Sequence, residues 1–263
     1  MKLLDRITAC LVNIRASRGR PAKTSDPVPL PASAAIEGRG MTIHAGWLID
    51  GSGGRARQNV RLEIRDGVIQ SLEEGSVPAS GARDSRPEPD FDLGGCTVIP
   101  GLTDSHVHLT MTGAVDEGLR TRLREAPFEV VRGMIRENLR EHLRHGVVAV
   151  RDGGGCRGNA LRFAKSHHER GQPVRVLAAG RAWHRPGRYG RLIGRPPAGG
   201  LALAEAIRQE GEPADHIKIV NSGLNSLTEY GRRTSPQFDL DEMSAAVQAA
   251  AARGLPVMVH ANG

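Results

Sequence analysis

Two histidines separated by one residue are the side chains of this sequence best suited to chemistry. His106 and His108 follow an apolar, β-branched run and Pro100-Gly101 in the stretch Thr97–Leu109, TVIPGLTDSHVHL. Alternate side chains of an extended strand share a face, so the two imidazoles lie side by side, about 7 Å apart along the strand. A pair of neutral imidazoles on a rigid strand supplies half of a metal site. Alternatively, both are ordinary strand histidines.

Two further candidates stand at the ends of later predicted strands. Lys218 lies among β-branched apolar neighbours in the segment HIKIVNSG, and His260 ends the strand 256–260. A lysine that points into an apolar interior is unfavourable unless its charge is paired or removed. Alternatively, Lys218 extends to the rim beside Asp215 and keeps its charge in water.

Strands and helices alternate from residue 97 onward, and this alternation would bring the four side chains together. Strands end near residues 108, 150, 180, 220 and 260, with helices predicted over 128–145, 158–170, 201–210 and 239–254. A βα period of about 30–40 residues is typical of a parallel (β/α) barrel, an α/β fold. Catalytic residues of such barrels cluster at the carboxyl ends of the strands, where these four candidates stand.

The residues before this alternation follow other patterns. Residues 41–96 alternate as β-strands, and Asp66-Gly67 between two such runs predicts a hairpin turn. This part is interpreted as a small β-sandwich segment. Residues 1–40 form a basic N-terminal extension followed by a flexible linker rich in Pro, Ala and Ser. The predicted parts of the chain are therefore 1–40, 41–96 and 97–263.

These motifs together resemble the amidohydrolase superfamily of metal-dependent hydrolases. The first barrel strand of that family carries a His-x-His pair after P-G-[LF]-[IVT]-D, matched here by PGLTD and then His106 and His108. The segments GVVAVRDGGG, VRVLAAGR and IKIVNSG are similar to those of the imidazolonepropionase-like and Xaa-Pro or Xaa-Arg dipeptidase-like branch. The resemblance covers about residues 41–263. It implies the N-terminal part of a (β/α)8 TIM-type barrel, about five of eight strands, preceded by the small β-sandwich.

The resemblance also implies a binuclear site. Its ligands to two divalent ions, expected to be Zn²⁺, would be His106, His108, Lys218 and His260, with Lys218 carbamylated by CO2 so that it bridges both ions. A metal-bridging hydroxide would then hydrolyse a C–N bond of an amide, cyclic amide or peptide-like substrate. The mononuclear deaminase branch lacks the bridging lysine. Tyr230 and Arg233 are expected to bind substrate, unless their loop is simply solvated.

Two residues of the family site have no counterpart in the sequence. The strand-six histidine and the strand-eight aspartate, which accepts the proton of the attacking water, would follow the last residue given. Asp104 and Asp152 fall on the wrong strands for that role, and Asp152 is more simply a structural strand-end pair with Arg151. The chain looks truncated after strand five. The alternative function is therefore an inactive or incomplete fragment of such an enzyme.

Composition narrows the partners and the compartment. The formal net charge is +7, but arginines between residues 120 and 144 alternate with glutamates, and aromatic residues make up only 3%. A solvated helix face explains this pattern better than a specific nucleic-acid partner, so a small-molecule substrate is expected. Three cysteines without CxxC spacing indicate free thiols and a cytoplasmic protein. No apolar run reaches the ~20 residues of a membrane span, and a homo-oligomer is left open.

Overall fold

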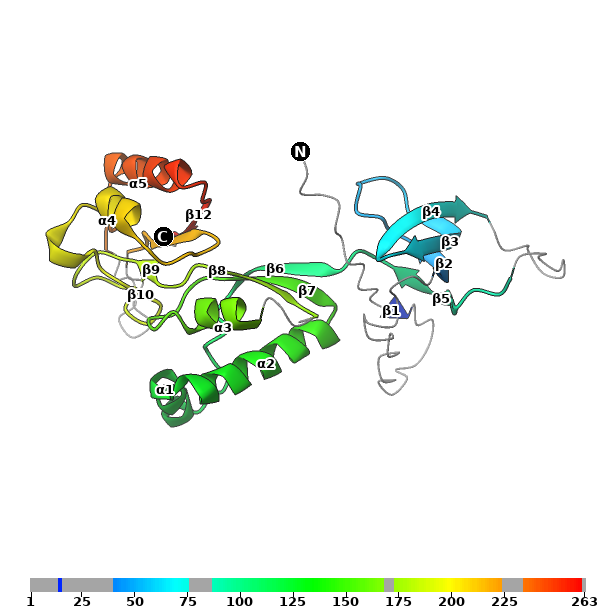
Figure 1. Ribbon diagram of the computed structural model, residues 1–263, viewed down its shortest axis with the longest axis horizontal. Helices are drawn as coiled ribbons and strands as arrows, with labels where there is room; N and C mark the ends of the chain where they lie inside the picture. Colours follow the sequence, from blue (N-terminus) through cyan, green and yellow to red (C-terminus); the bar gives the residue numbers. More distant parts are fainter. Residues whose placement is uncertain (1–13, 16–39, 76–86, 168–172, 224–233, 262–263) are drawn as a thin grey trace. The chain divides into compact units, whose positions relative to one another are not determined.

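The computed structural model of the chain describes residues 14–15, 40–75, 87–167, 173–223 and 234–261 (Figure 1). Most of the predicted N-terminal extension and the two predicted substrate-binding residues, Tyr230 and Arg233, lie outside the described residues. The chain divides into two compact units. One comprises Met1–Leu102 with Arg144–Val148, and the other comprises Thr103–Leu143 with Ala149–Gly263.

The first unit contains a five-stranded sheet with the strand order β1-β5-β2-β3-β4. Its strands are β1 (Ile14–Arg15), β2 (Met41–Leu48), β3 (Arg57–Arg65), β4 (Val68–Glu74) and β5 (Phe91–Val98). Asp66 and Gly67 both adopt positive φ, 51° and 73°, in the turn between β3 and β4, so the predicted hairpin is confirmed. The sandwich and the division of the chain into three parts stay predictions.

The Pro100-Gly101 pair separates this sheet from the strand that carries the histidines. Strand β5 ends at Val98, and β6 (Leu102–Val107) begins after the pair, in another sheet. Proline has no N–H for a strand ladder. A Cβ on Gly101 would lie 2.6 Å from Cγ2 of Val148, so only glycine allows this close approach. The stretch that leads to the histidines therefore contributes strands to two sheets, β5 to one and β6 to the other.

The remaining strands form two sheets, in which β10 pairs with β9, β9 with β11, β11 with β12 and β7 with β8, each in parallel. The orders are β6-β7-β8 and β10-β9-β11-β12. The strands after β6 are β7 (Val147–Asp152), β8 (Arg175–Ala178), β9 (Ala182–Trp183), β10 (Gly194–Arg195), β11 (Ile217–Val220) and β12 (Val257–His260). Asp215 joins β8 to the start of β11, since its Oδ2 accepts from Ala178 N at 2.8 Å. The predicted α/β alternation is thus present, whereas β9 and β10 were not predicted.

The helices lie close to their predicted positions. They are α1 (Glu117–Glu125), α2 (Phe128–Arg144), α3 (Asn159–His167), α4 (Leu203–Gln209) and α5 (Leu240–Ala252), with a short 3-10 turn, η2 (Ala198–Gly200). The apolar spacing of α2 buries Val131, Ile135 and Leu139 as expected. Asp239 and Glu242 form the predicted capping box at the start of α5. Helix α1 was not predicted, because it buries no side chain.

The largest core cluster of the second unit joins α4 and α5 to strands β9 and β11. Ile207 and Ile219 are fully buried in it, together with Trp183 and Phe238. This packing covers the sheet whose strands β11 and β12 carry Lys218 and His260. Within the part of the chain that the structure describes, none of the helices is long and apolar enough to cross a bilayer.

The core cluster predicts a large effect of a single truncation. Ile207→Ala should lower the free energy of unfolding by about 2–5 kcal/mol, because it removes three buried methyl or methylene groups and leaves a cavity. Leu240→Ala is the control, since Leu240 is 83% exposed at the start of α5 and should change stability by less than about 0.5 kcal/mol. Urea denaturation measures both. Equal effects of the two substitutions would contradict this account of the core.

Candidate metal centre

The four predicted ligand residues lie together in the second unit. His106 is on β6, His108 directly follows it, Lys218 is on β11 and His260 ends β12. Ring centroids of His106 and His108 are 5.4 Å apart, and those of His106 and His260 are 6.5 Å apart. Lys218 Nζ lies 3.1 Å from Nε2 of His106. Residues 106–108 and the two strands β11 and β12, which are distant in sequence, therefore contribute to one cluster of nitrogen atoms.

Strand register explains why Lys218 and His260 share this cluster. Strands β11 and β12 run parallel, with Lys218 opposite Met258 and Val220 opposite His260. Residues two apart on a strand point to the same face, so His260 lies one step beyond Lys218 on that face. A shift of one residue in this pairing would send one of the two side chains to the opposite face.

Lys218 is the most unusual member of the cluster, because it is only 1% exposed. The alternative that it reaches the rim beside Asp215 is wrong, since the Asp215 carboxylate bonds to β8 instead. Burial lowers the pKa of Lys218 to about 8, although the nearby Asp152 carboxylate opposes the shift. At pH 7 about a tenth of this amine is therefore neutral, far more than for a lysine in water.

Two of the three histidines have a lowered pKa. Desolvation lowers the pKa of His106 and of His260, and the Lys218 charge lowers both further. His106 is exposed, while His108 and His260 are half-buried. The lowered pKa of His106 and of His260 favours the neutral imidazole, which is the form that binds cations.

Asp152, the last residue of β7, supports the cluster in the structural role predicted for it, through contacts with the main chain. Its carboxylate is fully buried, with Oδ2 accepting from Leu109 N at 2.7 Å and Oδ1 from Gly154 N at 2.9 Å. Burial raises its pKa, and these main-chain bonds oppose that rise. Asp152 reaches Leu109 because the end of β7 lies beside the residues that follow β6. Asp152 therefore shapes the main chain next to the histidines.

The Asp152 contacts also orient His108. Gly154 O lies 2.9 Å from Nδ1 of His108. A carbonyl oxygen only accepts, so Nδ1 carries the proton and Nε2 keeps its lone pair. A Cβ on Gly153 would lie 2.9 Å from Cε1 of His108 and 3.1 Å from Cδ2 of His106, so only glycine fits behind the two rings. The run DGGG after β7 was the sequence signal for this support.

The donor set fits a divalent metal only if Lys218 takes part. Among the described residues, no three histidine, cysteine, aspartate or glutamate side chains are placed to hold a metal ion by themselves. The fourth member of the cluster is an amine that contacts His106 Nε2. An unmodified ammonium would compete with a cation for that nitrogen, whereas a carbamate would supply oxygen ligands. Asp104 does not complete the set, because its Oδ1 accepts from His106 N at 3.0 Å.

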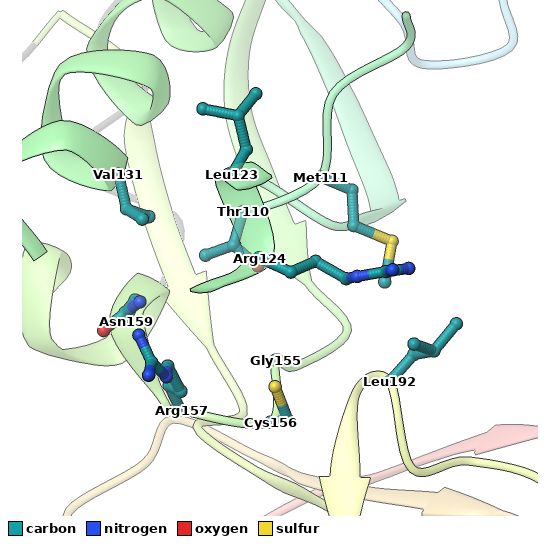
Figure 2. A pocket seen from close by; sticks show the side chains of 10 residues that line it. All are labelled: Thr110, Met111, Leu123, Arg124, Val131, Gly155, Cys156, Arg157, Asn159 and Leu192. Carbon is teal, nitrogen blue, oxygen red and sulfur yellow. The ribbon is translucent and has the colours of Figure 1, made fainter. Parts of the chain in front are cut away.

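A separate small hollow offers no comparable chemistry. It has a volume of about 20 Å³ and is lined by Thr110, Leu123, Cys156 and neighbours (Figure 2). That volume holds about one water molecule. Cys156 is exposed and Cys96 half-buried, and both are free thiols, as predicted for these two cysteines.

His216, two residues before Lys218, is expected to make the stability of the fold depend on pH. His216 is 2% exposed, and burial lowers its pKa from 6.5 to about 4. Between these values the unfolded chain binds a proton that the folded chain does not, so stability falls as pH drops from about 6.5 to about 4. Urea denaturation at several pH values should show this slope, and His216→Leu should flatten it. An unchanged slope in the variant would assign the acid sensitivity to other groups.

Comparisons with known proteins agree with this geometry. The amidohydrolase family matches residues 97–263. The imidazolonepropionase of Mycolicibacterium smegmatis is 26% identical over 223 residues, which cover 76% of this chain and 51% of that protein. The chain thus spans about half the length of this curated relative.

Solved structures share the fold. A Xaa-Pro dipeptidase with methionine bound in its active site superposes with a TM-score of 0.63 at 24% identity, covering 86% of this chain and 57% of its own. An amidohydrolase superposes with a TM-score of 0.62 at 26% identity, covering 85% and 56%. The family match covers more than half of the chain and includes all four clustered side chains. The predicted resemblance is confirmed, and the chain belongs to the amidohydrolase family.

Proposed function

We propose that this chain carries the metal ligands of an enzyme that hydrolyses a C–N bond in an amide, cyclic amide or peptide-like substrate. The observation that carries the proposal is the buried Lys218 amine, 3.1 Å from His106 Nε2 and facing three clustered imidazoles. Relatives named imidazolonepropionase and Xaa-Pro dipeptidase support this substrate class. We also propose that β6 to β12 form the N-terminal part of a (β/α)8 barrel, and that the two free thiols reflect a cytoplasmic protein.

The surroundings of Lys218 support its proposed carbamylation. The neutral amine nitrogen attacks the carbon of CO2, an N–C bond forms, and one N–H proton leaves to water. The lowered pKa, about 8, increases the neutral fraction that can react near neutral pH. The product carries a negative carboxylate in place of an ammonium, which removes an unfavourable buried cation.

His106, His108, His260 and the carbamylated Lys218 would hold two divalent ions, and Zn²⁺ suits this set of imidazole nitrogens and carboxylate oxygens. Such ions, when bound, polarise a substrate carbonyl and lower the pKa of water. The chain itself contributes the orientation of the ligands. The Gly154 carbonyl keeps the Nε2 lone pair of His108 available, and Asp152 keeps that carbonyl in place.

Metal content tests the ligand set directly. Chain purified with bicarbonate should bind about two zinc ions, and Lys218→Ala should bind one or fewer, because the shared ligand is lost. Elemental analysis after dialysis measures this. With ¹³C-bicarbonate, a carbamate signal should appear in the wild-type NMR spectrum and be missing in Lys218→Ala. Lys165→Ala, which changes an exposed lysine on α3, is the matched control. Two tightly bound ions in Lys218→Ala would refute the bridging role.

Turnover tests the reaction class. Zinc-loaded chain is assayed with N-acyl amino acids, Xaa-Pro dipeptides and cyclic amides, and Lys218→Ala should lower kcat/KM by about 100-fold or more, because loss of even a supporting residue around a metal lowers activity 10- to 100-fold. Zinc binding without hydrolysis of any of these substrates would favour the alternative, an inactive or incomplete fragment. Activity that survives both Lys218→Ala and His106→Ala would remove the proposed centre.

A further inference from the structure

Tyr189 lies beside the candidate centre, on the loop between β9 and β10. Its ring centroid is 5.8 Å from that of His260, and the ring planes are inclined by 43°. Tyr189 is 46% exposed. No hydrogen bond involves its hydroxyl within the described residues. One face of the ring thus contacts a proposed ligand while the hydroxyl is available to another molecule.

A buried amide fixes the main chain that carries Tyr189. Gln237 is 3% exposed, and its Nε2 donates to Tyr189 O at 2.7 Å and to Ser222 O at 3.1 Å. Ser222 in turn donates to His260 O from its main-chain N and from Oγ, at 3.0 and 3.1 Å. The Gln237 side chain therefore links the main chain at Tyr189 to the main chain at Ser222, and Ser222 is in turn bonded to the main chain at His260.

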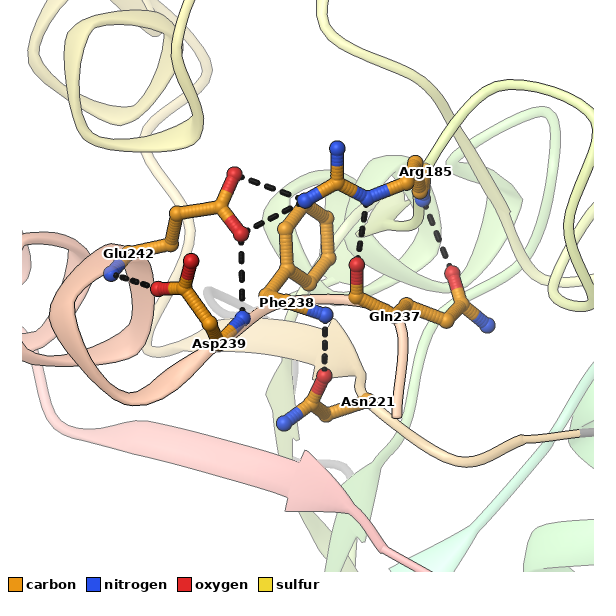
Figure 3. A network of polar contacts seen from close by, with 6 residues as sticks. All are labelled: Arg185, Asn221, Gln237, Phe238, Asp239 and Glu242. Atoms are coloured by element: carbon orange, nitrogen blue, oxygen red, sulfur yellow. Dashed lines mark hydrogen bonds and ion pairs between the residues drawn. The ribbon is translucent and has the colours of Figure 1, made fainter. Parts of the chain in front are cut away.

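The start of the same loop is held at Arg185, which contacts Gln237 and Glu242 (Figure 3). Gln237 Oε1 accepts from Arg185 N at 2.8 Å, and the Arg185 Nε donates to Gln237 O. The guanidinium also donates to both carboxylate oxygens of Glu242, at 2.7 and 2.5 Å, and stacks over Phe238 at 5.1 Å. Arg185, Gln237 and Glu242 thus form a clamp on this loop.

The residue after Tyr189 also restricts the loop. Gly190 adopts φ of 129°, and a Cβ there would lie 2.8 Å from Cβ of His184. Only glycine meets both conditions, so the chain turns back directly after Tyr189. A side chain at the tip of a loop held this firmly keeps a defined position relative to His260.

We propose that Tyr189 is a substrate-contacting residue and that Gln237 is its positioning residue. The inference rests on the proposed function of the centre. The phenol hydroxyl donates a hydrogen bond to a carbonyl or carboxylate oxygen of the bound amide, and the ring forms an apolar wall next to His260. A tyrosine suits this place because it joins a rigid apolar surface to one polar group. Ordering the loop in advance reduces the entropy lost when substrate binds.

The experiment uses the two tyrosines of the chain as reporters. Tyrosine is labelled with ¹³C in the ring, and the signals missing in Tyr189→Phe identify Tyr189. N-acetyl-L-proline, N-acetyl-L-methionine and N-acetyl-L-glutamate are added to the zinc- and bicarbonate-loaded chain. At least one should move the Tyr189 signals, and Tyr189→Phe should weaken its binding by about 5-fold, as expected for one lost hydrogen bond. Arg191→Gln, an exposed change on the same loop, should leave affinity unchanged.

The positioning role of Gln237 is tested with a double-mutant cycle. Gln237→Glu keeps the acceptor for Arg185 N but removes the donor to Tyr189 O. It should weaken probe binding about as much as Tyr189→Phe, and the double variant should lose no more than either single one. Additive losses would show that Gln237 affects binding independently of Tyr189, which would overturn its positioning role. If Gln237→Glu is unfolded, Gln237→His, which retains a donor, should restore the wild-type Tyr189 signals. Failure of that rescue in folded protein would count against positioning.

Two results separate this inference from the proposed function. If the chain binds zinc through Lys218 but all three probes leave the Tyr189 signals unmoved, the inference is overturned and the centre stands. If zinc does not bind at Lys218 and His106, the proposed function fails, and with it the centre that Tyr189 was inferred to serve.

Discussion

The contact between the Lys218 amine and the His106 imidazole is the interaction around which this part of the fold is arranged. A buried ammonium has a high desolvation cost, and the carboxylate of Asp152, which opposes the fall in its pKa, already accepts two main-chain hydrogen bonds. A side chain that served stability alone would be apolar at this position. A lysine at this position is therefore best explained by the proposed chemistry, which the buried environment promotes by lowering the pKa of the amine.

The strand register places another proposed ligand, His260, beside Lys218. Lys218 and His260 lie on neighbouring parallel strands, and the helices α4 and α5 cover that sheet with a core built from small and branched apolar side chains. On the other side, Asp152 and the glycines after it set the positions of His106 and His108. The proposed ligands are thus held by main-chain geometry more than by contacts among their own side chains.

Much of this was predictable from the sequence, because the signals were local. The His-x-His pair, the apolar strand around Lys218, the Asp66-Gly67 hairpin and the capping box at Asp239 each depend on residues close in sequence. The role of Asp152 was not predictable in that way, since it depends on the end of β7 lying beside the residues after β6. Tyr189 was missed for a similar reason. Its position depends on Gln237, 48 residues later, whose own spacing carries no motif.

The double use of Glu242 has a consequence for how this region opens. The same carboxylate caps α5 by accepting from Asp239 N and pairs with Arg185 on the loop of Tyr189. Fraying of the first helical turn would therefore release the loop as well, so the two segments belong to one cooperative unit of local unfolding. In an enzyme built in this way, the position of the Tyr189 ring beside the substrate would depend on whether the first turn of α5, some fifty residues later in the sequence, is folded.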